Sequence, residues 1–377
     1  MSPREQLEIF DSFFALIKAG LWEKEPRLSL YDNINWQVVY QLAQEQSVLG
    51  LVLAGVENSN VKPPQNLLLQ WIGEVQMTEQ QNKAMNDFIA VLIEKLRSNG
   101  VYALLVKGQG IAQCYEKPLW RLSGDVDLLL SRDNYYKSKE WLDDIGVVTE
   151  EELQYKKHIT YRVDGWDVEI HGTLRGEVNA RIDNMIDEVQ DAVFFGDSVR
   201  SWVNGKTQIF LPGVNEDVVF VFTHILQHFF RAGIGLRQIC DWCRLLWTYK
   251  DSLDHELLES RIRKAGIMSE WKAFGAFAVE YLGMPVEAMP MYSTNKKWSR
   301  KAYKICSYVM DVGNFGHNRD LSYKSQSPFF KRMMISLKYR TSDFAKQVMV
   351  FPLDAIRAYW YIWGTGLKVV AKRMLSK

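Results

Sequence analysis

The sequence predicts an α+β fold, with strands in the middle of the chain and helices on both sides. Apolar residues recur at helical spacing before about residue 98 and again after residue 213, whereas short apolar runs typical of buried strands lie between about 100 and 215. Hydrophobic residues make up 47% of the 377 positions, which is enough for a large core. We expect three regions: a helical region over residues 1–90, an α/β core over 91–215 and a helical region with a basic tail over 216–377.

The N-terminal part of the chain is expected to be helical. Residues 4–57 carry apolar side chains at helical spacing, among them Leu7, Phe10, Phe13, Phe14 and Ile17. A long helix is predicted from about Pro64 to Ser98, with a stripe of Phe88, Val91, Leu92 and Leu96. Asn99-Gly100, directly after this segment, is a typical helix stop.

Three segments in the middle have the pattern of strands. Residues 101–106 and 125–130 are short apolar runs, and residues 158–170 contain a hairpin around Asp164-Gly165. If these two residues form the turn, the register of the hairpin follows. It places Val163 opposite Trp166, Arg162 opposite Asp167, Thr160 opposite Glu169, and His158 opposite His171.

Helices are predicted again over residues 217–230 and 236–249. Residues 321–377 hold eleven Lys or Arg and two acidic residues, a local charge of +9 that leaves about −8 on the rest of the chain. Aromatic residues are interspersed with these charges. This composition predicts one of two roles for the tail. It either contacts an anionic membrane peripherally, or its apolar face packs on the chain's own helices.

The overall charge and cysteine content narrow the class of protein. A net charge of +1 gives no broad positive field, so general binding of nucleic acid is not expected. Four scattered cysteines are too few for a disulfide scaffold and fit a reducing compartment. No secretory signal is expected from the first dozen residues, and no uncharged apolar stretch is long enough for an ordinary transmembrane helix. We expect a cytoplasmic protein.

The segment 104–130 carries the clearest chemical pattern. A predicted strand ends at Lys107-Gly108-Gln109-Gly110, and Asp125 and Asp127 follow on the next strand. Residues two apart on a strand project to the same side, so the two carboxylates lie together and repel each other unless a cation binds between them. Mg²⁺ prefers such ligands, together with phosphate oxygens. Glycines at a helix N-terminus allow a phosphate to approach the backbone N–H groups.

This arrangement resembles the nucleotidyltransferase superfamily typified by DNA polymerase β and kanamycin nucleotidyltransferase. A longer pattern resembles the uncharacterised nucleotidyltransferases associated with bacterial surface-polysaccharide genes. It consists of the motif LLVKG, the motif R-x-x-G-D-V-D-L-L that begins at Arg121, and the later motif V-E-I-H. Gly235, Leu236, Arg237 and Asp241 are similar to a helical element of that family. Gln109 stands where the superfamily has Ser or Gly, so no serine hydroxyl is present at the turn.

The resemblance implies a mixed sheet with helices and a third carboxylate on a later strand, with Asp167 and Glu169 as candidates. Three carboxylates would hold two Mg²⁺ ions, or Mn²⁺, for in-line transfer from an NTP. Lys107 and Arg121 either contact phosphates or neutralise the carboxylates. The resemblance also gives Arg237 a role on the substrate side, although Arg237 and Asp241 are also spaced as a structural i, i+4 ion pair.

The hairpin register distinguishes the two candidate acids. Asp167 faces Arg162, which can pair with it, whereas Glu169 faces only the hydroxyl of Thr160. We therefore predict that Asp125, Asp127 and Glu169 bind the metal ions and are catalytic. His158 and His171 are expected to meet at the edge of this site, either as solvated side chains or in contact with phosphate or the acceptor.

Two further patterns are weaker. His224 and His228 have the i, i+4 spacing of zinc ligands, as a zinc hydrolase would require, but Ile225 stands where an H-E-x-x-H motif has Glu, which favours a buried or capping role. Cys240 and Cys243 form a single C-x-x-C at helical spacing, which is typical of a core position.

The predicted function is Mg²⁺-dependent transfer of a nucleotidyl group from an NTP to a hydroxyl or phosphate acceptor. The acceptor is a small molecule, a saccharide or a protein. The alternative is a catalytically silent nucleotide-binding or scaffold protein in surface-polysaccharide assembly.

Overall fold

The computed structural model describes residues 3–28, 31, 34–150, 157–231, 233–314, 329–361 and 364. The helices and strands, with η for a 3₁₀-helix, are α1 (Pro3–Leu21), α2 (Trp36–Glu45), α3 (Leu49–Glu57), α4 (Gln65–Ser98), β1 (Ala103–Val106), α5 (Gly108–Ala112), η2 (Pro118–Trp120), β2 (Asp125–Leu130), α6 (Arg132–Ile145), β3 (Val147–Glu150), β4 (His158–Val163), β5 (Trp166–His171), α7 (Ala180–Phe195), β6 (Val199–Asn204), β7 (Thr207–Pro212), α8 (Val214–Arg231), α9 (Leu236–Thr248), α10 (His255–Ala265), α11 (Met268–Glu280), η3 (Val286–Ala288), α12 (Lys296–Val312) and α14 (Phe329–Val350). The fold is a mixed α+β fold, as predicted.

The described strands form one seven-stranded sheet in the order β3-β4-β5-β2-β1-β7-β6. The sheet is mixed, because β2 runs parallel to β5 and β1 runs parallel to β7, whereas β1 and β2 are antiparallel. The predicted hairpin register is confirmed at every position, with Asp164 and Gly165 as the turn. The first strand begins at Ala103 rather than at 101, because the N–H of Val101 bonds to the carbonyl of Leu96 in α4 instead of to the sheet.

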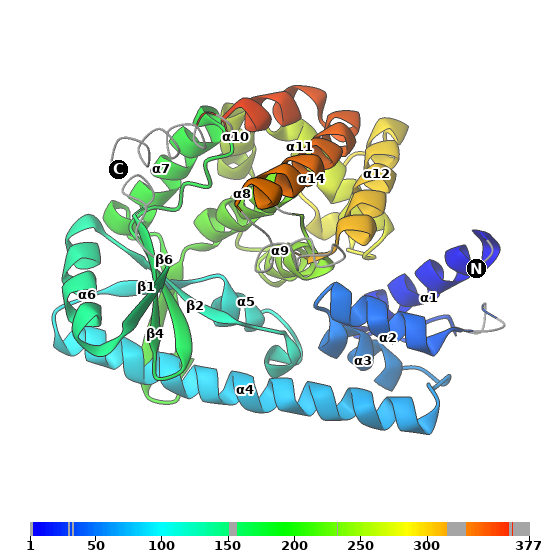
Figure 1. Ribbon diagram of the computed structural model, residues 1–377, viewed down its shortest axis with the longest axis horizontal. Helices are drawn as coiled ribbons and strands as arrows, with labels where there is room; N and C mark the ends of the chain where they lie inside the picture. The colour runs from blue at the N-terminus through cyan, green and yellow to red at the C-terminus, as the bar shows by residue number, and fades with distance from the viewer. Residues whose placement is uncertain are drawn as a thin grey trace.

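Each face of the sheet packs against a different set of apolar residues from the helices. Leu105, Val126 and Leu128 pack with residues of α4 and α6 on one face. On the other face, Val106 and Leu129 belong to a large cluster that includes α8, α9, α11 and α12. Figure 1 shows α4 along one side of the sheet and these C-terminal helices on the opposite side. This alternation is the period of two expected for strands buried on both faces.

The long helix α4 ends where the sequence predicted. Gly100 follows the helix with φ +68°, a conformation that glycine adopts without strain. The predicted stripe is wrong at one position, since Val91 is 51% exposed. The buried line is Met85, Ile89, Leu92 and Leu96, and Val91 lies about 100° around the helix from Leu92.

The helices at the two ends of the chain pack against each other. The indole N–H of Trp22 donates to the carbonyl of Leu282 at 2.6 Å, and the side-chain amide of Gln46 donates to that of Val309 at 3.2 Å. Their apolar residues share one buried cluster. The first and last parts of the sequence therefore form a continuous helical body next to the sheet.

Part of the basic tail packs on this helical body. Phe351 is buried and lies against Phe229 and Phe274, with ring centroids 5.7 and 6.3 Å away. Residues 321–328, 362–363 and 365–377 of the predicted tail lie outside the described residues. Among the helices that the structure describes, none is long and apolar enough to cross a membrane.

Helices α1 and α3 cross at glycines, and this contact generates a stability prediction. A Cβ on Gly55 would lie 2.1 Å from the carbonyl oxygen of Leu16, whereas a Cβ on Gly73 in α4 would have no neighbour within 4 Å. We expect Gly55→Ala to lower the free energy of unfolding by about 1–3 kcal/mol, because the helices must separate. Gly73→Ala should raise it by about 0.5–1 kcal/mol through its better helix propensity. Urea melts of both variants test this, and equal effects would contradict it.

Candidate active site

Three carboxylates converge on one face of the sheet, on its inner strands β2 and β5. The parallel pairing of β2 and β5 places Asp127 directly beside Glu169, and Asp125 lies two residues earlier on the same face of β2. One carboxylate oxygen from each of Asp125, Asp127 and Glu169 lies within 4.8 Å of the others. The sequence-predicted trio is therefore brought together. Asp167 is outside this group, and its Oδ1 lies 2.9 Å from Nε of Arg162, the predicted cross-strand partner.

The turn after β1 places a lysine against this cluster. Val106 pairs with Asp127, so Lys107 leaves the strand beside it, and Nζ of Lys107 lies 2.7 Å from Oδ1 of Asp127. The backbone of Lys107 has φ +57° and ψ −146°, a strained conformation for a residue with a side chain that costs about 1–3 kcal/mol. Gly108 continues the turn at φ +41°. Of the two predicted roles for Lys107, the structure shows the neutralising contact.

Two histidines also contact the carboxylates, which corrects two predictions. Nε2 of His171 lies 2.8 Å from Oδ1 of Asp127, and Nε2 of His158 lies 3.0 Å from Oε2 of Glu169. Glu169 therefore has a second partner besides Thr160, because the imidazole of His158 reaches its carboxylate diagonally across the hairpin. Nor are the histidines simply solvated, since each contacts an acid and the His171 side chain is only 16% exposed.

The charges at the cluster shift its pKa values in opposite directions. Repulsion from Asp127, with burial, raises the pKa of Asp125 to about 6. Burial alone would raise the pKa of Asp127, but the charge of Lys107 and the hydrogen bond from His171 outweigh it and lower this pKa. The pKa of Glu169 is also lowered, because hydrogen bonds from both histidines outweigh its burial. At neutral pH the three acids are ionised. Asp125 is the most exposed of them, and its negative charge is the least balanced by neighbouring positive groups.

The two predicted arginines have different surroundings. Arg121 forms a double contact with Asp241 of α9, with Nε to Oδ1 at 2.8 Å and Nη2 to Oδ2 at 2.7 Å. Tyr115 also donates to Asp241, at 2.8 Å. The predicted ion pair between Arg237 and Asp241 does not form, because the Asp241 carboxylate is paired with Arg121 instead. Arg237 instead donates to the carbonyl of Leu122 at 2.7 Å, just before the β2 acids.

Helix α4 carries a buried asparagine, Asn82, whose hydrogen bonds join the segments around the site and which the sequence analysis did not identify. The side chain of Asn82 donates to the carbonyls of Leu119 and Arg121 at 2.7 and 2.8 Å, and accepts from Gln109 at 2.7 Å. The Gln109 side chain is therefore buried against α4, and only its backbone remains at the turn. A Cβ on Gly110 would lie 2.7 Å from the Leu211 side chain, so this glycine allows close packing. A lone Asn in a polar helix gave no signal of this role.

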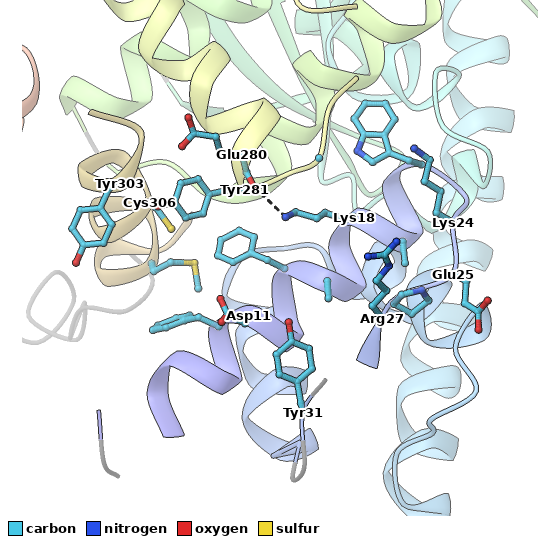
Figure 2. Close-up of a pocket in the computed structure, with 18 of the residues that line it drawn as sticks. Asp11, Lys18, Lys24, Glu25, Arg27, Tyr31, Glu280, Tyr281, Tyr303 and Cys306 are labelled. Carbon is cyan, nitrogen blue, oxygen red and sulfur yellow. Dashed lines mark hydrogen bonds between the residues drawn. The ribbon is translucent and has the colours of Figure 1, made fainter. Parts of the chain in front are cut away.

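Two cavities are lined by residues that the sequence predicted for the site. One of about 180 Å³ is lined by Lys107, His158, Glu169 and His171 together with residues of α8. Another of about 250 Å³ is lined by Arg121 and Arg237 and by residues of α1 and α3. A larger cavity of about 1150 Å³ lies between α1, α11 and α12 (Figure 2), and its walls hold none of the predicted site residues.

The carboxylate cluster fits a divalent cation. Oxygen atoms from three acids face one point, and the raised pKa of Asp125 records a repulsion that a bound cation would relieve. Hard carboxylate oxygens suit Mg²⁺ or Mn²⁺. His224 and His228 contact each other, with Nε2 atoms 3.0 Å apart, but no third donor joins them among the described residues. Cys240 and Cys243 are fully buried core residues, as predicted.

The match to a family model agrees with the nucleotidyltransferase family resemblance seen in the sequence. A family model described as "Uncharacterised nucleotidyltransferase" matches residues 32–283, about two thirds of the chain. Among solved structures, the chain is similar to an antigenic nucleotidyltransferase-like protein from Paracoccidioides brasiliensis, with 14% identity over 49% of this chain and 90% of that one and a TM-score of 0.30. No curated protein gives a significant match.

Because the charge of Asp125 is repelled by Asp127, we predict that removing this charge stabilises the fold, and that the gain depends on pH. Its pKa is about 6 in the folded chain and about 3.9 when unfolded, so its ionisation destabilises the fold progressively as the pH rises between these values. Asp125→Asn should therefore raise the melting temperature of the metal-free protein at pH 8 and leave it nearly unchanged at pH 4. Thermal melts in EDTA test this. An equal shift at the two pH values would contradict it.

Proposed function

Because the chain belongs to the uncharacterised nucleotidyltransferase family, we propose that it is a Mg²⁺-dependent enzyme that transfers a nucleotidyl group from an NTP to a hydroxyl or phosphate acceptor. The observation that carries the proposal is the convergence of Asp125, Asp127 and Glu169 within 4.8 Å on adjacent strands. The charge of Asp125 beside Asp127 is unfavourable unless a further cation binds, and a nucleoside triphosphate is normally bound together with a divalent cation.

In this proposal the three acids hold the metal ions. Bound Mg²⁺ would neutralise charge on the triphosphate and on the attacking oxygen. The acceptor oxygen forms a bond to the α-phosphorus, and the bond from that phosphorus to the α–β bridging oxygen breaks. The β- and γ-phosphates leave together as pyrophosphate, and a hydroxyl acceptor loses its proton to solvent. Mn²⁺ would serve with the same oxygen ligands.

The turn at Lys107 and Gly108 is the proposed contact for the phosphates. Lys107 already has one ammonium contact to Asp127, and a triphosphate beside the cluster would offer it further oxygens. A Cβ on Gly108 would have only the Asp125 carbonyl oxygen nearby, at 3.7 Å, so the space next to this turn is open. Gly110 and the backbone of Gln109 belong to the same turn, whose first N–H groups have no acceptor within the helix.

Arg121 and Arg237 are proposed to act on the other side of the acids. Arg121 is a positioning residue, because its pairing with Asp241 fixes the segment that leads into β2. Arg237 lies in the wall of the cavity of about 250 Å³ and is near enough to lower the pKa of Asp125. A guanidinium at this place would favour an anionic group on the nucleotide or the acceptor.

The direct test is incubation with each labelled NTP, Mg²⁺ or Mn²⁺ and a cell extract, followed by identification of the labelled product. We expect one NTP to label an acceptor, and the labelling should disappear in the double variant Asp125→Asn, Asp127→Asn. Nucleotide binding without transfer under all these conditions would favour the catalytically silent alternative.

The two acids of β5 provide a matched pair of variants. Glu169→Gln removes a proposed metal ligand, so we expect the rate of transfer to fall about 100-fold or more. Asp167→Asn removes only an acid that Arg162 already neutralises, and we expect a change of less than about threefold. Initial rates at saturating metal measure both effects. The reverse order would overturn the assignment of Glu169.

A further inference from the structure

A second group of donor atoms lies beside the three acids. His158, Glu169 and His171 each offer one ligand atom, and these atoms lie within 4.8 Å of one another. Nε2 of His158 is 3.0 Å from Oε2 of Glu169, and Nε2 of His171 is 3.5 Å from the same oxygen. Two imidazoles and one carboxylate are a donor set that binds zinc with a fourth position open.

The backbone places these donors together. His158 and His171 are opposite each other across the β4–β5 hairpin, so their side chains project from the same face. Their rings are stacked, with centroids 4.7 Å apart and an angle of 26° between the planes. Glu169 is two residues before His171 on that face. A site on two paired strands is held more firmly than one on loops.

The two distances from Glu169 to the histidines suit a tetrahedral ion. Zinc bonds to nitrogen and oxygen are about 2.0–2.1 Å long, which places neighbouring ligand atoms about 3.3 Å apart. The two contacts of Glu169, at 3.0 and 3.5 Å, lie on either side of this value. The same three side chains line the cavity of about 180 Å³, which leaves room for a water molecule as the fourth ligand.

We propose that His158, Glu169 and His171 bind one Zn²⁺ ion beside the carboxylate site for Mg²⁺. Nε2 of His171 would then exchange its contact with Oδ1 of Asp127 for the ion, and Lys107 would remain as the partner of Asp127. Imidazole nitrogens suit Zn²⁺ and are poor ligands for Mg²⁺, whereas Asp125 and Asp127 offer only oxygen. Glu169 is common to both groups, so Zn²⁺ and Mg²⁺ compete for it. The proposal goes beyond nucleotide transfer and does not rest on it, because Zn²⁺ binding is measured without substrate.

The experiment is calorimetric titration of the metal-free full chain with Zn²⁺, with the absorption spectrum of bound Co²⁺ as a second measurement. We expect one ion per chain and a visible Co²⁺ spectrum. His158→Gln should weaken Zn²⁺ binding at least about tenfold and abolish the spectrum. The control is His255→Gln, an exposed histidine at the start of α10, which should bind Zn²⁺ like the parent.

Two acid variants separate this site from the one proposed for Mg²⁺. Asp125→Asn should weaken Mg²⁺ binding and leave Zn²⁺ binding within about threefold of the parent, because Asp125 is outside the histidine group. Glu169→Gln should weaken both, and it tests the proposal even if His158→Gln fails to fold. The absence of stoichiometric Zn²⁺ binding, or equal affinity in the parent, His158→Gln and Glu169→Gln, would overturn the proposal. The histidines would then serve only as partners of the acids.

Discussion

The charge of one buried carboxylate, Asp127, is the constraint on which the site depends. The residue is 3% exposed, and its Oδ1 contacts Lys107 at 2.7 Å and His171 at 2.8 Å. Removing one partner of such a buried pair typically costs about 3–5 kcal/mol, because a charge is left without compensation. The strained backbone of Lys107 is explained by this requirement, since the turn directs its ammonium group to Asp127.

The sheet topology brings these partners together. Lys107 follows β1, Asp127 lies on β2 and His171 ends β5, and β2 is the central strand of the three. The parallel pairing of β2 with β5 requires the intervening α6, β3 and β4, whose last strand also supplies His158. The helices then fix the approach to β2 through Asn82 of α4 and Asp241 of α9.

Much of this arrangement could be predicted from local patterns. The period of two put Asp125 and Asp127 on one face, the Asp164-Gly165 turn gave the hairpin register, and the motifs indicated the nucleotidyltransferase family that the family model then matched. Contacts between distant segments could not be predicted in the same way. The diagonal reach of His158 to Glu169 depends on side-chain length, and the pairing of Arg121 with Asp241 depends on how α9 packs.

The most direct test of nucleotidyl transfer at this site uses one NTP labelled in turn on its α- and γ-phosphates, with Mg²⁺ and the acceptor source. Nucleotidyl transfer moves the α-label to the acceptor and releases the γ-label in pyrophosphate. We predict that only the α-label reaches the acceptor, and that it does so in the parent but not in Asp125→Asn, Asp127→Asn. Transfer of the γ-label to the acceptor, or α-labelling that persists in the double variant, would contradict the account.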